Sequence, residues 1–485
     1  MEIADFSAAT DTIIISDLHL ADAEPPHPRN PLWKRFKRKK YFIDRSFKDF
    51  LEEIQKKTQN KLELILNGDI FDFDSVTEIP PKKRPFRVNW LEKKCGLSSE
   101  EKKSRYKISV ILRDHDVWID ALRGFILNGN RVVFVIGNHD MELHWPGVQE
   151  DILHTLDVPQ EFRQNVRFCE WFYISNKDTL IEHGNQYDAY CVCSNPVHPL
   201  VREGFGVFVR LPFGNLAARY MVNNMGLINP HVESNYIMGL GQWMVFFFKY
   251  FIRVQPQIAW TWFWTSGVTL FLSIGEGFLP AIKDPLTTEA RVEYIAAKAN
   301  AAPYMVRALR ELHEHPAVFS PIKILQELWL DRALLLVTLL FSSFWIFSVL
   351  NLITPLSIYW FIGIFLVFFP FLIYYAASVK SDVYAFQDKA IENIPIAAQI
   401  TKVPRVIHGH THRPIHSDVQ GIEVANTGTW SPAFKDPKCM EKYSIECFAW
   451  IRPKADGSSR EVKLMVWKNH GFHEISKAAT VEAHK

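Results

Sequence analysis

Five short apolar runs in this chain each end in side chains of the kinds that bind metal ions. The clusters at their ends are Asp17-Leu18-His19, Gly68-Asp69, Gly137-Asn138-His139-Asp140, His183-Gly184 and Gly409-His410-Thr411-His412. Several of the runs are β-branched and apolar nearly throughout, which predicts strands covered on both faces. The predicted strands are Thr12–Ser16, Leu62–Leu66, Val132–Ile136, Thr179–Ile181 and Arg405–Ile407. Because a strand that ends in a ligand places it at one edge of a sheet, these strands are expected to build one site.

The spacing of the motifs divides the chain into two parts of one α/β domain and a long insertion. Residues 1–190 alternate predicted strands with helical stretches such as Tyr41–Lys57 and Asp114–Leu127, the pattern typical of an α/β domain. The insertion covers 191–384 and contains a charged helical portion at Thr287–His315, and the domain continues over 385–485. Three further strands are predicted to complete a second sheet, at Ile422–Ala425, Tyr443–Ile451 and Glu461–Trp467.

The insertion contains an uncharged stretch long enough to cross a membrane twice. No Asp, Glu, Lys, Arg or His occurs from Ala333 to Val379. A spanning helix needs about 20 apolar residues, and residues 333–353 and 357–377 each fit, with a turn at Thr354-Pro355-Leu356 between them. The alternative is a helical hairpin buried in a large soluble core, although core helices rarely avoid charge on every face over such a length.

The order of the motifs limits the number of membrane spans. His183 precedes the apolar segments and His410 follows them, so a shared site requires an even number of spans. We expect two, with the apolar segment Ile258–Gly275 lying in the membrane interface, which Trp prefers, or packed against the hairpin. Four spans, with Met238–Ile252 as the additional one, are the alternative.

Charge predicts the orientation and excludes one class of partner. Arg332 and Lys380 flank the hairpin, and positive flanks predict a cytoplasmic catalytic side at a plasma or inner membrane. The formal net charge is only +2, so no global field attracts nucleic acid and no nucleic acid partner is expected. Basic residues instead cluster at Trp33–Lys40 and Lys82–Lys107, which are either solvated loops or a patch for anionic lipid or a polyanionic substrate.

The five motifs, in this order, resemble those of the calcineurin-like metallophosphoesterases. The resemblance implies a four-layer αββα sandwich, here with a large helical, membrane-associated insertion, and two divalent metal ions as cofactors. Such a metal pair neutralises a phosphate ester, turns a bound water into a hydroxide nucleophile and orients in-line attack. Carboxylate, imidazole and amide ligands suit Mn, Fe or Zn, and of these we expect Mn.

The family pattern also implies a role for each motif residue. The expected ligands are Asp17, His19 and His412 for the first metal, Asn138, His183 and His410 for the second, and Asp69 as the bridge between them. His139 is expected beside the phosphate as a general acid or an electrostatic partner of the leaving oxygen, with Asp140 holding and polarising its imidazole. Asp72 is a candidate to support the site from behind the ligands, and Arg413 is a candidate phosphate contact.

Three stretches are most similar to the UDP-2,3-diacylglucosamine pyrophosphatase group: Ser16–Leu20, Glu182–Asp188 and Gly409–Pro414. The match covers residues 11–190 and 385–430, and the chain departs from the group's best-known members in having His139 instead of arginine and a larger insertion. The resemblance implies hydrolysis of a phosphodiester or pyrophosphate bond in an amphiphilic, lipid-linked substrate taken from a lipid bilayer. The alternatives are a membrane-anchored phosphatase or phosphodiesterase acting on soluble nucleotides or phosphoproteins, and a non-catalytic scaffold. Scaffolds tend to lose ligands, whereas this chain keeps them all.

Overall fold

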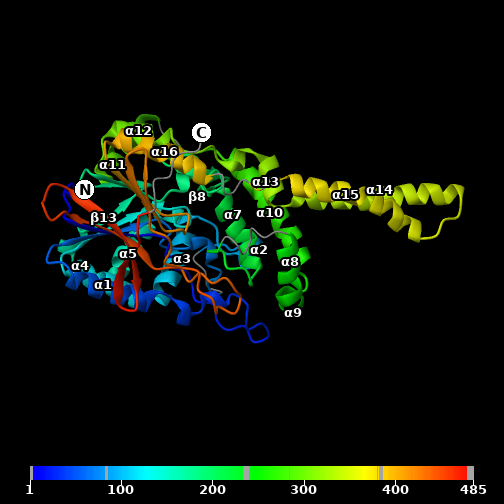
Figure 1. The fold of residues 1–485 in the computed structure, drawn as a ribbon, viewed down its shortest axis with the longest axis horizontal. Helices are drawn as coiled ribbons and strands as arrows, with labels where there is room; N and C mark the ends of the chain where they lie inside the picture. Colours follow the sequence, from blue (N-terminus) through cyan, green and yellow to red (C-terminus); the bar gives the residue numbers. More distant parts are fainter. Residues whose placement is uncertain are drawn as a thin grey trace.

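Two β-sheets stack face to face, and helices cover the outer face of each (Figure 1). The computed structural model describes residues 4–81, 86–232, 240–282, 285–379, 381 and 386–477. The layers confirm the expected αββα sandwich, to which a large helical region with two long apolar helices is added.

The first sheet has seven strands in the order β14-β13-β12-β1-β2-β3-β4. Their bounds are β1 Asp11–Ile15, β2 Leu62–Asn67, β3 Arg131–Val135, β4 Val166–Cys169, β12 Cys447–Pro453, β13 Arg460–Lys468 and β14 Gly471–Glu474. Its outer face is covered by α1 Asp44–Lys56, α3 Glu101–Asp114, α4 Asp116–Leu127 and α5 Pro146–Leu156. In α1, for example, Phe47, Phe50, Leu51 and Ile54 recur every three or four residues and are all buried in this layer.

The second sheet has five strands in the order β10-β11-β9-β6-β5. Their bounds are β5 Phe172–Ser175, β6 Thr179–Glu182, β9 Arg405–His408, β10 Ile415–Val419 and β11 Ile422–Asn426. Its outer face is covered by α11 Pro285–Lys298, α12 Pro303–Arg310 and α16 Phe386–Thr401. Between the two sheets lies a layer of buried apolar side chains, among them Ile14, Ile65, Val133, Ile181 and Ile407. Several of the motif-bearing strands are apolar nearly throughout, as expected for strands that protein covers on both faces.

Two expectations for the sandwich were wrong in part. Of the three strands predicted to complete the second sheet, only β11 belongs to it; β12 and β13 extend the first sheet beyond β1, and residues 443–446 lie outside any strand. The charged portion Thr287–His315 is two helices, broken where Asn300 takes a left-handed conformation. It packs on the second sheet, so the segment expected to be an insertion also supplies part of the sandwich.

The rest of the inserted segment is a short hairpin and a group of helices. The two-stranded sheet is formed by β7 Leu200–Glu203 and β8 Gly206–Val209. The helices are α7 Phe213–Tyr220, α8 Leu240–Phe246, the π-helix η8 Phe247–Phe251, α9 Ile252–Val254, α10 Ile258–Phe278, α13 Pro321–Glu327, α14 Leu330–Ile353 and α15 Tyr359–Ser378. The short helices α2 Trp90–Cys95 and α6 Gln160–Arg163 lie outside this segment.

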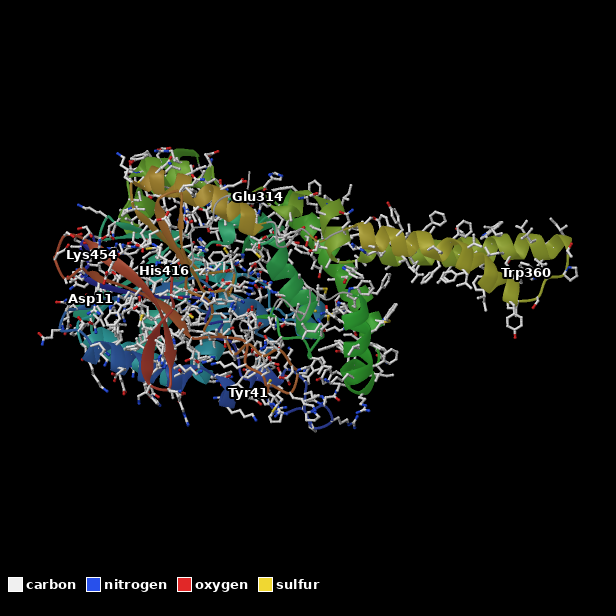
Figure 2. All side chains as sticks on the ribbon, in the orientation of Figure 1. Asp11, Tyr41, Glu314, Trp360, His416 and Lys454 are labelled. Atoms are coloured by element: carbon white, nitrogen blue, oxygen red, sulfur yellow. The ribbon has the colours of Figure 1, made fainter. Side chains whose placement is uncertain are left out.

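Helices α14 and α15 form a long antiparallel hairpin that projects from the body (Figure 1). Among the described residues, these two helices alone are long and apolar enough to span a membrane. Leu330, Arg332 and Ser343 are the buried residues of α14, and α15 has none. Trp360, which lies near the far end of the hairpin (Figure 2), is exposed. The alternative of a hairpin buried in a soluble core is therefore wrong.

Within the described part of the chain, the neighbouring apolar segments contribute no further candidate span. α10 packs against α7 and α13 and contacts α14, and Thr265, Ser266 and Thr269 on it are buried. The segment weighed as a fourth span, Met238–Ile252, is described only from residue 240 and is broken into α8, η8 and α9. Lys380, one of the charges used to orient the hairpin, lies outside the described residues.

Four lysines of the two basic clusters are buried, whereas most of the other described basic residues in these clusters are exposed. In Trp33–Lys40, both Lys34 and Lys37 are buried, and Lys37 Nζ lies 2.5 Å from Asp22 Oδ1. In Lys82–Lys107, residues 82–85 lie outside the described part, while Lys103 and Lys107 are buried, each paired with a glutamate. Four of these lysines therefore hold loops and helices together instead of forming a surface for anions.

Candidate metal centre

All five motifs meet at one end of the sandwich. β1, β2 and β3 are parallel neighbours in the first sheet, and β6 and β9 are parallel neighbours in the second. The loops that follow them are joined by backbone hydrogen bonds, from Asp17 N to Gly68 O at 3.1 Å and from Gly409 N to His183 O at 2.8 Å. Residues nearly 400 positions apart are therefore held at one edge.

The first group of potential ligands is Asp17, His19 and His412. His412 Nε2 lies 3.2 Å from Asp17 Oδ1 and 3.3 Å from His19 Nε2. Asp17 and His19 are fully buried or nearly so. This is the set expected at the first metal, and the structure brings all three of its residues together.

The second group is Asp69, His183 and His410. His183 Nε2 lies 3.1 Å from Asp69 Oδ2, and the same carboxylate oxygen lies 3.9 Å from His19 Nε2 of the first group. Asp69 thus stands between the two groups, where a bridging carboxylate would stand.

Buried oxygen atoms without partners indicate that these groups fit metal ions. Asn138 Oδ1 is buried and accepts no hydrogen bond from any described residue. Asp17 Oδ1 is also buried and accepts none, although His412 Nε2 lies 3.2 Å from it. A buried polar atom without a partner costs free energy, on the order of 1–3 kcal/mol. Carboxylate, imidazole and amide donors converging on one point are the ligands that Mn, Fe and Zn accept. The donor set therefore fits two divalent ions.

The backbone at the ligands is unusual. Five potential ligands have positive φ angles, a conformation that non-glycine residues rarely adopt: Asp17 at 56°, His19 at 50°, Asp69 at 52°, His410 at 67° and His412 at 56°. Such conformations cost about 1–3 kcal/mol each and gather at functional sites. These conformations turn the side chains at the strand ends toward one point, and the surrounding structure compensates for their cost.

Glycines in the motifs allow the loops to approach the ligands closely. A Cβ atom at Gly68 would lie 2.3 Å from Nδ1 of His183, and one at Gly409 would lie 2.6 Å from Oδ2 of Asp17. Both distances are shorter than any non-bonded contact permits. The glycine before each ligand is thus needed for packing of the two sheets' loops around the site.

The ligand imidazoles are held by their other ring nitrogens. His183 Nδ1 donates to the carbonyl of Asn67 at 3.0 Å, and His412 Nδ1 lies 3.2 Å from the carbonyl of His231. His410 Nε2 is 3.0 Å from Asp188 Oδ2. Hydrogen bonds of this kind set the ring orientation and raise the basicity of metal-binding histidines.

The support of His139 differs from what was expected. Its Nδ1 lies 3.2 Å from Asp72 Oδ1, so Asp72 and not Asp140 holds this imidazole. Asp140 instead accepts from the backbone N–H groups of Gly137 and Ile70, and thereby fixes the loop that carries the motif. Burial lowers the pKa of His139, but the carboxylates of Asp72 and Asp69 outweigh burial and raise the pKa to about 10. These two carboxylates therefore favour the protonated form of the ring.

Several residues at the site were not assigned a role from the sequence. His231 is buried, with its ring centroid 4.2 Å from that of His19. Asp188 belongs to the EHGNQYD stretch, and with Cys191 and His410 it forms a further group that could hold a metal. Asn215 on α7 donates to the carbonyl of Asn138 at 2.6 Å and to Asp74 Oδ2 at 2.5 Å. His231 and Asn215 come from the inserted segment, where no strand-end motif points to them.

Arg413 is not brought to the site. Its side chain is exposed, and it does not line the cavity that contains the ligands. His412 turns inward, and the chain then runs out toward β10.

One cavity of about 330 Å³ joins the ligands to the base of the hairpin. The ligand groups contribute His19, Asp69, Asn138, His410 and His412, together with His139. The wall farther along consists of Phe213, Ala217, Ala218 and Met221 from α7 and its end. At the other end lie Glu327, Trp329, Arg332 and Val379, where the hairpin leaves the body. The cavity therefore extends from the ligand groups to the base of the two apolar helices.

Residues 11–205 match the family described as calcineurin-like phosphoesterase. The chain contains a calcineurin-like phosphoesterase domain over these residues. Four of the five motifs fall within this range, and the fifth reaches the same site from beyond the inserted segment. A search of curated proteins returns no match. The domain and the two ligand groups support a metal-dependent phosphoesterase, and its substrate is a phosphate ester.

Proposed function

We propose that this protein is a membrane-associated, two-metal phosphoesterase that hydrolyses a phosphodiester or pyrophosphate bond in an amphiphilic, lipid-linked substrate such as UDP-2,3-diacylglucosamine. The observation that carries the proposal is the cavity: its walls contain both the ligand groups and the base of the apolar hairpin. A substrate with a phosphate at one end and acyl chains at the other could place the phosphate at the ligand groups and the acyl chains toward the hairpin.

The proposed ligands are divided between two metal ions. Asp17, His19 and His412 hold one divalent ion, Asn138, His183 and His410 hold the other, and Asp69 joins them. We propose Mn as the bound metal, with Fe and Zn as alternatives, because carboxylate, amide and imidazole donors are mixed at the site. When bound, the ion pair supplies charge neutralisation and an activated water for in-line attack.

His139 is proposed as the residue that stabilises the leaving oxygen. Asp72 engages its Nδ1 at 3.2 Å, so Nε2 remains as the nitrogen that faces the substrate. The ring lines the cavity next to both ligand groups, within reach of an oxygen that leaves the phosphorus. A protonated imidazole at this place donates a proton to the leaving oxygen, or stabilises its charge.

The hairpin is proposed to anchor the enzyme, with the phosphoesterase domain on the cytoplasmic side. α14 and α15 each have the length and composition of a span, and their side chains are exposed instead of packed. Arg332 at the base of α14 donates to the carbonyl of Val379 at the end of α15, at 2.8 Å, so both ends of the hairpin meet beside the cavity. Two spans also return the chain to the side where His183 and His410 share a site.

The test is to compare UDP-2,3-diacylglucosamine with its deacylated analogue, using the detergent-purified full chain with added Mn and mass spectrometry of the products. Release of UMP and the lipid monophosphate, at a much higher kcat/KM for the diacylated compound, is the expected result. Cleavage of a generic aryl phosphodiester without cleavage of the diacylated compound would keep the metal chemistry and discard the lipid-linked substrate. A membrane-anchored enzyme for soluble nucleotides or phosphoproteins would then be the better description.

A further inference from the structure

The segment formed by α8, η8 and α9 is apolar on two opposite faces. Trp243, Phe246 and Phe251 on one face pack against Met225 and Ile228 in a small apolar core. Phe251 is completely buried there. This face attaches the segment firmly to the body of the protein.

The opposite face is apolar as well, yet no described residue covers it. Met244, Val245, Phe248 and Ile252 have exposed fractions of 53%, 67%, 64% and 47%. Their spacing of one, four and eight residues places them along one side of the helical segment. Single exposed apolar residues are ordinary, but a contiguous row of large ones marks a surface that contacts another apolar phase.

Aromatic and basic residues extend this row. Trp260 and Trp264 in the first turns of α10 are exposed, and the ring of Trp90 lies 6.2 Å from that of Trp264. Lys249 and Arg253 are exposed on the helical segment itself. Tryptophan and basic side chains beside an apolar face are typical of helices that lie in a membrane interface.

The position of the segment relative to the hairpin identifies the partner. In Figure 1, α8 and α9 lie on the side of the body from which α14 and α15 project, and they run across the direction of the hairpin. The described segment, residues 240–254, is shorter than the roughly 20 residues that a span requires. A bilayer that contains the hairpin therefore meets the exposed face of this segment along its length.

We propose that the α8–α9 segment lies flat in the headgroup region of the bilayer that the hairpin spans, with Met244, Val245, Phe248 and Ile252 facing the lipid. The proposal rests on the membrane association argued above. Its consequence concerns the site: Met221 and Val222 line the cavity and also pack against this segment. A segment held at the membrane surface would hold the wall of the cavity at the level of the headgroups, where the phosphate of a membrane lipid lies.

The test places an environment-sensitive fluorophore on single cysteines in the full chain, reconstituted in phospholipid vesicles. Phe248→Cys reports on the exposed face, Phe344→Cys on the middle of α14, and Ser458→Cys on an exposed turn of the sandwich. The six native cysteines are buried or half-buried, and unsubstituted protein labelled in parallel sets the background. Nitroxide-labelled lipids then quench the fluorophore according to its depth.

At position 248 we expect quenching by a nitroxide near the headgroup to exceed quenching by a nitroxide deep in the acyl chain by about twofold or more. The order should reverse at position 344, and neither lipid should quench at position 458. Absence of quenching at 248 while 344 is quenched would overturn this proposal and leave the spanning hairpin intact. Stronger quenching at 248 by the deep nitroxide would also overturn it, because the segment would then enter the hydrocarbon core. Val245→Cys repeats the measurement at a second site on the same face.

Discussion

The sandwich buries its apolar residues, whereas the hairpin exposes them. In the sandwich, all five residues of β1 and all six of β2 are buried, and even Lys107 is buried beside Glu142 at 2.6 Å. In the hairpin, none of the residues of α15 is buried, although the helix contains no charged residue. The apolar residues of the sandwich are covered by protein, whereas those of the hairpin need an apolar phase outside the protein.

The two regions meet at the cavity, where residues of the inserted segment contact the loops that carry the proposed metal ligands. Asn215 and Arg219 of α7 bind the loop that follows β2: Arg219 Nη2 lies 2.7 Å from Asp74 Oδ1, and Asn215 also contacts the carbonyl of Asn138. The inserted segment is therefore part of the support of a proposed ligand, as well as a route to the membrane.

The largest loss of activity is expected from a substitution of Asp69, the side chain that both ligand groups share. Asp69→Ala should abolish metal-dependent hydrolysis and lower the bound metal, because no neighbouring carboxylate can take the bridging position. Metal content by plasma mass spectrometry and turnover of an aryl phosphodiester measure both. Wild-type activity with two bound metals would show that the ligand assignment is wrong.

A chelator should have the same consequence in the unsubstituted protein. Removing divalent ions should bring hydrolysis to background, and added Mn should restore it, since the metal pair is the proposed means of activating water at this site. Circular dichroism before and after treatment controls for unfolding. Undiminished turnover in the metal-free protein would contradict the account.

His139→Ala should separate catalysis from metal binding. Loss of a general acid lowers turnover by about 10²–10⁴-fold. Metal content should stay unchanged because the ring of His139 is held by Asp72, which is not a proposed ligand. His154→Ala, at an exposed histidine of α5, is the matched control. Loss of metal from His139→Ala would identify this residue as a ligand.

Asn215→Ala tests the connection between the two regions. Removing a residue that orients a metal ligand commonly lowers metal affinity by about 10–100-fold, and we expect the weaker binding to appear in a titration with Mn. Asn128→Ala, at the exposed end of α4, is the control. Equal metal affinities for the two variants would mean that α7 has no influence on the ligands.

Ala218→Phe should have the smallest and most selective effect. The larger side chain would fill part of the cavity and obstruct an acylated substrate. We expect kcat/KM for that substrate to fall by about tenfold, the effect of losing one or two buried methylene contacts. A small aryl phosphodiester, which needs only the ligand groups, should be cleaved as before. Ala297→Phe in α11, where Ala297 is exposed, is the control. Equal losses for both substrates would argue against an acyl-binding cavity.

The sequence was a good guide where local signals determine position. The five motif-bearing strands were predicted within one residue at each end because apolar runs with polar ends leave little choice. The order of the motifs also predicted that the proposed ligands gather at one edge, where Asp17, His19 and His412 and also Asp69, His183 and His410 come together. It was a poor guide where long-range pairing decides. Alternation in β12 and β13 predicts strands but does not say which sheet they join. His231 and the role of Asp72 depend on how separate loops pack, which no neighbouring residue reveals.

The most direct test of the central claim is to locate the metals. Crystals of the full chain grown with Mn and measured at the manganese absorption edge should show two anomalous peaks per chain. One should lie among Asp17, His19 and His412, the other among Asn138, His183 and His410, with Asp69 between them. A single peak, or a peak at the Asp188, Cys191 and His410 group alone, would contradict the two-metal site.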